Sequence, residues 1–145
     1  MRLTTFTDYS LRVLIYLAIR GEQNTTIARI AQDYDISRNH LMKVVQELSQ
    51  KGYVTAARGK NGGLRLSRPA AQINIGALVR DMENDMAIAE CFGPRNQCLL
   101  TPACSLAGLF AEALEAFLAV LDRHSLEDVL PGRQRAELVK ILGAT

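Results

Sequence analysis

The 145-residue sequence has only three cysteines, no tryptophan and no long apolar run. Because no stretch approaches the roughly 18 consecutive apolar residues of a membrane-spanning helix, we expect no membrane span. The N-terminal sequence MRLTTFTDYS lacks the apolar core of a signal peptide, so we expect a cytoplasmic protein, where disulfides are uncommon. An odd number of cysteines agrees with that expectation and favours metal binding or reactive thiols.

The positive charge is concentrated in the first half of the chain. Residues 1–68 carry 11 Lys/Arg and 5 Asp/Glu, a net charge of +6, whereas residues 69–145 carry 6 and 10, a net charge of −4. A basic half attracts polyanions and suggests nucleic acid, although chance imbalance on a solvated surface gives the same count. Hydrophobic residues make up 48% of the chain, which is enough for one buried core with an extension.

Apolar residues at helical spacing predict three helices in the first 50 residues. The first is expected to begin at a capping box formed by Thr5 and Asp8. The second follows residues 25–26 and ends near Gln32, and the third spans about Arg38–Gln50 after an N-cap serine. A short helix, a tight turn and a second helix that opens with polar side chains form a helix-turn-helix.

Two strand-like segments follow the third helix, at residues 53–58 and 64–68. The sequence GKNGG between them supplies the glycines and the Asn-Gly pair that a hairpin turn favours. A basic hairpin at this place completes a winged helix-turn-helix. We therefore predict a mainly α fold with a small β-hairpin wing, in which residues 1–70 form a DNA-binding domain.

The remaining residues, 71–145, are predicted to hold a cysteine loop and dimerisation helices. Asn74 is the expected N-cap of a fourth helix, and Thr101-Pro102 the expected start of a long helix with Cys104 in its first turn. The apolar stripe of this long helix is too wide for a small domain to bury alone. It predicts a partner helix, most simply the same helix of a second subunit. Two short helical pieces are expected after it.

Polar residues at the start of the third helix and on the wing are candidate DNA contacts. In a helix-turn-helix the N-terminal part of the second helix enters the major groove, where Asn and Arg suit base edges and Ser suits phosphates. Ordinary solvation explains any one of these residues equally well, but the fold and local charge together favour double-stranded DNA. The candidates are Ser37, Arg38, Asn39, His40 and Lys43 in the helix, and Arg58, Lys60 and Asn61 in the wing.

All three cysteines lie in one stretch, at Cys91, Cys98 and Cys104, and we call residues 91–104 the cysteine loop. Their C-x6-C-x5-C spacing matches neither the paired knuckles of structural zinc nor the C-x-x-C of dithiol enzymes, so we do not expect an enzyme. Iron–sulfur clusters take thiolate ligands at varied spacing, and a helix N-terminus favours the thiolate form. Spacing alone leaves a cluster, zinc and unligated thiols open, and a four-iron cluster needs a fourth ligand.

These segments together resemble the iron–sulfur winged-helix repressors. The resemblance rests on LTTFTDYSLRVLIYLA, ISRNHLMKVVQELSQKGYV, RGKNGGLRL and the cysteine loop ending in TPAC, and extends from residue 1 to about 130. It implies a homodimer in which Cys91, Cys98 and Cys104 ligate one [4Fe-4S] cluster per subunit, with [2Fe-2S] as the alternative. In the branch that regulates cluster biogenesis, a histidine ligand follows the last cysteine by three residues. Here that position is Ala107, which argues against that branch, and the segments quoted above resemble the nitric-oxide-sensing branch.

The fourth ligand implied by the resemblance is an acidic residue near the start of the first helix, contributed across the dimer. Asp8 matches that position, and the capping role predicted above competes for the same side chain. Arg12, one turn further on, is placed to pair with Asp8 when no cluster is bound. We therefore expect a dimeric repressor that binds a palindromic operator and releases it when nitric oxide attacks the cluster. A redox- or iron-responsive regulator of the same fold is the alternative.

Overall fold

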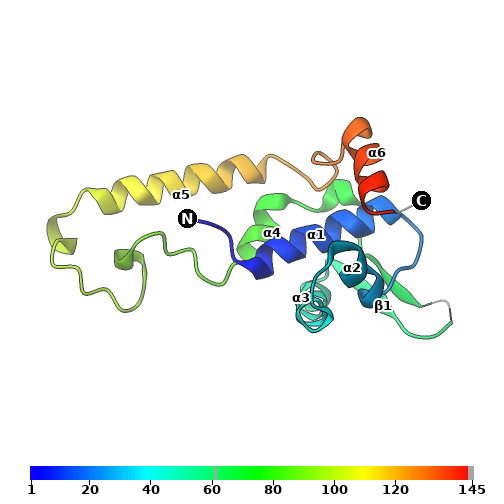
Figure 1. Ribbon diagram of the computed structural model, residues 1–145. Helices are drawn as coiled ribbons and strands as arrows, with labels where there is room; N and C mark the ends of the chain where they lie inside the picture. Colours follow the sequence, from blue (N-terminus) through cyan, green and yellow to red (C-terminus); the bar gives the residue numbers. More distant parts are fainter. Residues whose placement is uncertain (61, 144–145) are drawn as a thin grey trace.

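The computed structural model describes residues 1–60 and 62–143 and is mainly helical, with one antiparallel hairpin (Figure 1). This confirms the predicted fold class. Within the described part of the chain, no helix is long and apolar enough to cross a membrane. The elements in chain order are α1 (Thr5–Arg20), α2 (Ile27–Tyr34), α3 (Arg38–Gln50), β1 (Val54–Ala57), β2 (Gly63–Leu66), the 3-10 turn Ala70–Gln72, α4 (Ile75–Met82), the 3-10 turns Glu90–Phe92 and Thr101–Ala103, α5 (Leu106–Asp122) and α6 (Gly132–Ile141).

Helices α1, α2 and α3 pack around one core, as the apolar spacing predicts. Helix α2 begins after Thr26, whose hydroxyl accepts a hydrogen bond from the Arg29 amide at 3.1 Å. It runs two residues beyond the predicted end and stops at Asp35, which takes a left-handed conformation at φ 53°. The helix-turn-helix is thereby confirmed. The most deeply buried apolar side chains of α1 and α3 are Val13, Leu14, Tyr16, Leu17, Leu41, Val44 and Leu48.

The start of α1 differs from the predicted capping box. Thr4, not Thr5, is the N-cap, and its hydroxyl accepts a hydrogen bond from the amide three residues on, at 3.3 Å. Asp8 does not reach back to the cap but pairs with Arg12, with 2.8 Å between Oδ2 and Nη2. The carboxylate that accepts from the Thr4 amide belongs to Glu83, at 3.1 Å. The prediction was wrong because the capping acid comes from a residue far along the chain, which no local pattern reveals.

The wing consists of β1 and β2, paired antiparallel from Val54 opposite Leu66 to Ala57 opposite Gly63. Its second strand returns to the body of the protein, where the Leu64 amide donates to the Thr25 carbonyl at 2.7 Å. Gly63 has a φ of 145°, and a Cβ atom there would lie 2.8 Å from that same carbonyl oxygen. The close approach of wing and body therefore requires glycine at this position.

Helix α4 connects the winged helix-turn-helix to the C-terminal half of the chain. Asn74 caps it as predicted, accepting from the Ala77 amide at 2.9 Å, and its Nδ2 donates to the Asp122 carbonyl at 2.7 Å. A guanidinium–carboxylate pair between Arg80 and Asp122 closes the same junction. The inner face of α4 is fully buried with the core of α1, through Leu78, Val79 and Met82.

Helix α5 begins at Leu106, and the predicted start at Thr101 is wrong. Residues Thr101–Ala103 form a separate 3-10 turn, and Cys104 has an extended backbone at φ −91° and ψ 117°. Cys104 therefore lies before the helix and not in its first turn. In Figure 1 the C-terminal half of α5 lies along α4, while its N-terminal half projects from the body with the cysteine loop at its end.

The N-terminal part of the apolar stripe of α5 is left uncovered, as its width predicts, while Leu114, Phe117 and Leu121 pack partly against the core. Only Leu118 is buried, whereas Leu109 is 57% exposed and Phe110 is 38% exposed. Two short helical pieces were expected after α5, but the described residues there contain one α-helix, α6. Residues 126–129, where the first piece was expected, form a hydrogen-bonded turn. The division of the chain near residue 70 stays a prediction.

Candidate nucleic-acid interface and cysteine loop

The start of α3 presents a polar surface to solvent. Ser37 is the N-cap, and its hydroxyl accepts from the His40 amide at 3.4 Å. The side chains of Arg38, Asn39 and Lys43 are exposed on the helix that follows. All of these were predicted as DNA contacts, and the structure brings them together on one end of α3.

The wing carries the remaining predicted contacts. Arg58 and Lys60 are exposed beside the hairpin, while Asn61 lies outside the described residues. Two exposed residues of α3, Met42 and Gln46, were not predicted, although they follow Asn39 at helical spacing. They line a hollow of about 610 Å³ that is bounded on the wing side by Ala56 of β1, so the exposed face of α3 extends beyond the predicted set.

His40 differs from the other predicted contacts because its ring packs back on α1. The ring centroids of His40 and Tyr9 lie 4.9 Å apart, and the Arg12 guanidinium carbon lies 5.6 Å from the Tyr9 centroid. Arg12 in turn pairs with Asp8, and its carbonyl accepts a hydrogen bond from Tyr34 at 2.8 Å. A continuous chain of contacts therefore joins Asp8 to the recognition helix.

A charged network fixes α1 against α2 behind this surface. The Asp33 carboxylate accepts from the Tyr16 hydroxyl at 2.6 Å and from Arg29 Nε at 3.0 Å, and Arg20 lies 4.0 Å away. Burial acts to raise the pKa of Asp33, but the hydrogen bonds from Tyr16 and Arg29 outweigh burial and leave that pKa lowered. The network therefore favours the ionised carboxylate and stabilises the helix pair that carries the turn.

The wing is tied to α4 by a second polar contact. The Tyr53 hydroxyl, just before β1, donates to the Asp81 carboxylate at 2.5 Å, and Arg68 stacks 4.7 Å from the Tyr53 ring centroid. Burial and the Asp81 hydrogen bond together raise the pKa of Tyr53 to about 12. Tyr53 therefore stays protonated at neutral pH and keeps its donor to α4.

The three cysteines are all free thiols. Cys91 lies half-buried in the 3-10 turn Glu90–Phe92, Cys98 is exposed, and Cys104 is half-buried ahead of α5. Among residues 1–60 and 62–143, no three His, Cys, Asp or Glu side chains come close enough to hold one metal ion. The structure thus places the cysteines on one loop without gathering them, and it leaves Asp8 apart from them.

The cysteine loop is held by its own side chains, not by the core. The Glu90 carboxylate accepts from the Gln97 amide at 2.8 Å, and the Thr101 hydroxyl donates to the Cys98 carbonyl at 2.9 Å. Thiolates are the ligands that iron–sulfur clusters take, and the cysteine loop supplies three of the four that a four-iron cluster needs. The residues present therefore fit such a group in their chemistry, and binding requires the loop to close around it.

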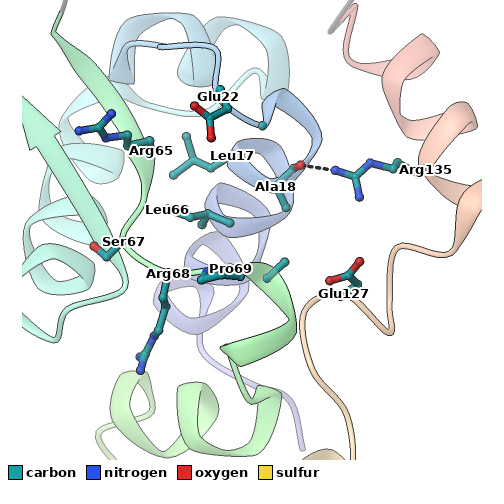
Figure 2. Close-up of a pocket in the computed structure, with 12 residues that line it drawn as sticks. Leu17, Ala18, Glu22, Arg65, Leu66, Ser67, Arg68, Pro69, Glu127 and Arg135 are labelled. Carbon is teal, nitrogen blue, oxygen red and sulfur yellow. Dashed lines mark hydrogen bonds between the residues drawn. The ribbon is translucent and has the colours of Figure 1, made fainter.

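A separate hollow of about 490 Å³ lies between the C-terminal end of α1, β2 and α6 (Figure 2). Arg135 of α6 donates to the Ala18 carbonyl at 2.5 Å, and the charged side chains of Glu22, Arg65 and Glu127 surround the opening. None of the predicted site residues lines it. The Arg135 hydrogen bond beside it ties α6 to the C-terminal end of α1.

A family model described as an iron-dependent transcriptional regulator, Rrf2, matches residues 3–132. The chain belongs to the Rrf2 family. The family match confirms the predicted relationship to the iron–sulfur winged-helix repressors, and two individual relatives agree with it. This Rrf2 chain is 48% identical over 132 residues to the HTH-type transcriptional regulator NsrR of Bacillus licheniformis, which covers 90% of this chain and 92% of that protein. It is 47% identical over 144 residues to NsrR of Bacillus subtilis, and the match covers 98% of this chain and 97% of that protein.

Solved structures agree with this assignment. CymR, the global cysteine regulator of B. subtilis, has a TM-score of 0.70 at 27% identity and covers 89% of this chain and 95% of its own. IscR of T. potens has a TM-score of 0.74 and coverages of 94% and 91%, but at 22% identity it shows the fold alone. This Rrf2 protein is therefore a DNA-binding transcriptional repressor of the iron–sulfur regulator type and not an enzyme.

Proposed function

We propose that this Rrf2 protein acts in the cytoplasm as a homodimeric repressor that binds a palindromic operator and releases it when nitric oxide is present. The observation that carries the proposal is the chain of contacts from Asp8 through Arg12 and Tyr9 to His40. It gives the predicted fourth ligand a physical route to the recognition helix. The two NsrR relatives support the choice of signal.

Cys91, Cys98 and Cys104 would hold one [4Fe-4S] cluster per subunit, with Asp8 of the partner subunit as the fourth ligand. When bound, the cluster supplies iron that reacts with nitric oxide. An oxygen ligand suits iron–sulfur chemistry less well than a thiolate, so Asp8 is the ligand most easily exchanged. Its pairing with Arg12 joins two side chains that are each 45% exposed, and such pairs contribute only about 0–1 kcal/mol. Giving up the pair with Arg12 would therefore cost Asp8 little, and its carboxylate would be free to serve as the fourth ligand.

The second subunit is expected to cover the exposed apolar face of α5. Leu106 and Leu109 are more than half exposed, and Phe110 and Val120 lie on the same helix. A two-fold pair places the two α3 helices at successive major grooves, about 34 Å apart, which matches a palindromic operator. Arg38, Asn39 and Lys43 then contact bases and phosphates from α3, and Ser37 contacts phosphate at the helix N-terminus. His40 contacts DNA only where its packing on Tyr9 allows, and Arg58, Lys60 and Asn61 approach the minor groove.

A change at Asp8 is passed on by the side chains that touch it. When Arg12 gains or loses its carboxylate partner, the position of its guanidinium over Tyr9 changes, and Tyr9 supports the ring of His40 on α3. A coupling of about 1–3 kcal/mol, which is typical of allosteric regulators, would change operator affinity about 5- to 150-fold.

The test uses protein purified without oxygen and assayed for iron, sulfide and operator affinity. We expect brown protein with iron and sulfide, tight operator binding by fluorescence anisotropy, and weaker binding after nitric oxide is added. Colourless or zinc-loaded protein would rule out the cluster, and unchanged affinity would rule out nitric oxide as the signal. The three accessible thiols favour a redox- or iron-responsive regulator as the second candidate, so parallel titrations with oxygen, peroxide and an iron chelator separate the two.

A further inference from the structure

The carboxylate of Glu83 is the meeting point of three donors from the first turn of α1. Its Oε2 atom accepts from the Thr7 hydroxyl at 2.6 Å, from the Thr4 amide at 3.1 Å and from the Thr4 hydroxyl at 3.2 Å. The Thr7 side chain is completely buried, so its hydroxyl cannot exchange this acceptor for bulk water. The three contacts span 76 and 79 residues of sequence.

Glu83 lies where helix α4 ends and the segment that leads to the cysteine loop begins. Glu83 is the C-cap of α4, and its amide donates to the Val79 carbonyl at 2.8 Å. It is therefore the last residue fixed to α4 and the first of the segment, residues 83–90, that leads into the cysteine loop. The same side chain holds the start of α1, so one carboxylate joins the helix turn that carries Asp8 to the segment that leads into the cysteine loop.

Helix termini explain why an acid is needed here. The first amides of a helix have no partner within it, and a carboxylate near them is favoured both by hydrogen bonding and by the helix dipole. The N-cap hydroxyl of Thr4 already accepts from the Thr7 amide, so the Thr4 amide requires another acceptor. Asp8, the acidic residue in this turn, faces Arg12 instead. Glu83 takes the capping function from across the fold.

We infer that Glu83 is a positioning residue that ties the first turn of α1 to the start of the cysteine-loop segment and thereby sets the place of the Asp8 carboxylate. The Asp8 amide donates to the Thr4 carbonyl at 3.0 Å, the first backbone hydrogen bond of α1. Any displacement of Thr4 is therefore passed directly to Asp8. What Asp8 binds rests on the proposed function, but the tie between Thr4, Thr7 and Glu83 does not.

The first arm of the test measures the tie on protein from which any cluster has been removed. Glu83→Ala removes three charge-assisted hydrogen bonds, so we expect the amides of residues 4–8 to exchange with solvent at least about tenfold faster. Exchange in α3 should not change. Glu83→Gln keeps an oxygen acceptor and should restore most of the protection. Unchanged exchange at residues 4–8 in Glu83→Ala would overturn the inference.

Asp85→Ala is the matched control, because it removes the same charge two residues away. Within the part of the chain that the structure describes, the Asp85 carboxylate accepts from the Ala87 amide alone, at 2.8 Å, inside its own turn. We expect Asp85→Ala to keep wild-type exchange at residues 4–8. If it accelerates exchange there as much as Glu83→Ala does, the effect is one of general charge and the assigned role of Glu83 is refuted.

The second arm asks whether Glu83 acts through Asp8, using cluster-loaded protein and its visible circular dichroism. Glu83→Ala should change the spectrum in the same direction as Asp8→Ala, and the double variant should match Asp8→Ala alone. Additive changes would overturn positioning through Asp8. If the wild-type protein holds no cluster, the proposed function fails, and the exchange arm still decides the tie. Should Glu83→Ala fail to fold, as judged by far-ultraviolet circular dichroism, Thr7→Val replaces it in both arms, because it removes the 2.6 Å donor to the same carboxylate, and unchanged exchange at residues 4–8 in that variant would overturn the inference.

Discussion

Replacing Tyr9 by alanine should weaken the response to nitric oxide without preventing cluster binding. Tyr9 is not a predicted ligand or DNA contact, and its ring lies between Arg12 and His40. Removing the ring breaks the chain of contacts at its centre, whereas Tyr9→Phe keeps both ring contacts. The comparison of these two variants therefore isolates the ring from other effects of substitution.

The size of the effect follows from the weakest contact in the chain. The Tyr9–His40 ring pair is worth about 0.5–1.5 kcal/mol and the Arg12–Tyr9 cation–π contact about 0.5–1 kcal/mol at an exposed site. The weakest contact limits what this route transmits, so the route carries about 0.5–1 kcal/mol of the proposed total coupling of about 1–3 kcal/mol. About 1.4 kcal/mol corresponds to tenfold in affinity. Tyr9→Ala should therefore reduce the ratio of operator affinities before and after nitric oxide about 2- to 5-fold.

The assay is operator affinity by fluorescence anisotropy, before and after nitric oxide, at matched iron and sulfide content and fixed salt. The quantity to compare is the ratio of the two affinities, because Tyr9→Ala also alters the support of α3 in both states. A ratio equal to that of the wild type and of Tyr9→Phe would refute the route through Tyr9. A double-mutant cycle of Tyr9 and His40 in urea unfolding gives the pair energy independently of any cluster.

Three further predictions concern the wing, the dimer and the folded state. Asp33→Asn should lower the free energy of unfolding at pH 7 by about 1.5–3 kcal/mol, since hydrogen bonds to a charged group are lost. Because the folded pKa of Asp33 is lowered from 3.8, the stability it contributes is complete above about pH 4–5 and disappears as the pH falls through the folded pKa. Urea titrations from pH 7 to pH 3 should therefore show a smaller acid loss in Asp33→Asn, and an equal loss would contradict the network. Gly63→Ala should weaken operator binding several-fold in anisotropy measurements and lower stability by about 1–3 kcal/mol, because its φ of 145° and the nearby Thr25 carbonyl leave no room for Cβ. Wild-type operator affinity and stability in Gly63→Ala would contradict the prediction, because strand β2 would then be able to shift and make room for Cβ. Leu109→Glu should give a folded monomer by light scattering at micromolar concentration, since this side chain is 57% exposed on α5 and a dimer would bury two such charges. A stable dimer would place the interface elsewhere.

The elements that could be predicted from sequence are those whose signals are local. Helical spacing located α1, α3 and α4, and Asn74 caps α4 because an N-cap needs only the amide three residues on. The same kind of signal failed at Thr101, although Thr-Pro is a good helix start. The Thr101 hydroxyl donates to the Cys98 carbonyl and accepts from Asn96, so loop contacts occupy the group that would have capped the helix.

The candidate site divides in the same way. The cysteines and the polar end of α3 are visible in the sequence because residue type and spacing identify them. The packing of His40 on Tyr9 and the hydrogen bonds of Glu83 to α1 join residues 31 to 79 positions apart, and only the folded chain brings them together. The predicted pairing of Asp8 with Arg12 is confirmed and its predicted capping role is wrong, while its role as a ligand stays a prediction.

The packing of helix α1 limits how far a structural change at Asp8 can spread through the protein. Its middle is packed on all sides, with Val13, Leu14 and Leu17 at most 1% exposed, so moving the helix as a whole would disturb the entire core. Its first turn is different, because it is held by Glu83 on one side and bounded by half-exposed Asp8 and Tyr9 on the other. Rearranging that turn alone costs a few hydrogen bonds, about 1–3 kcal/mol. A signal at Asp8 is therefore expected to reach α3 through the neighbouring side chains, while the core of α1 stays in place.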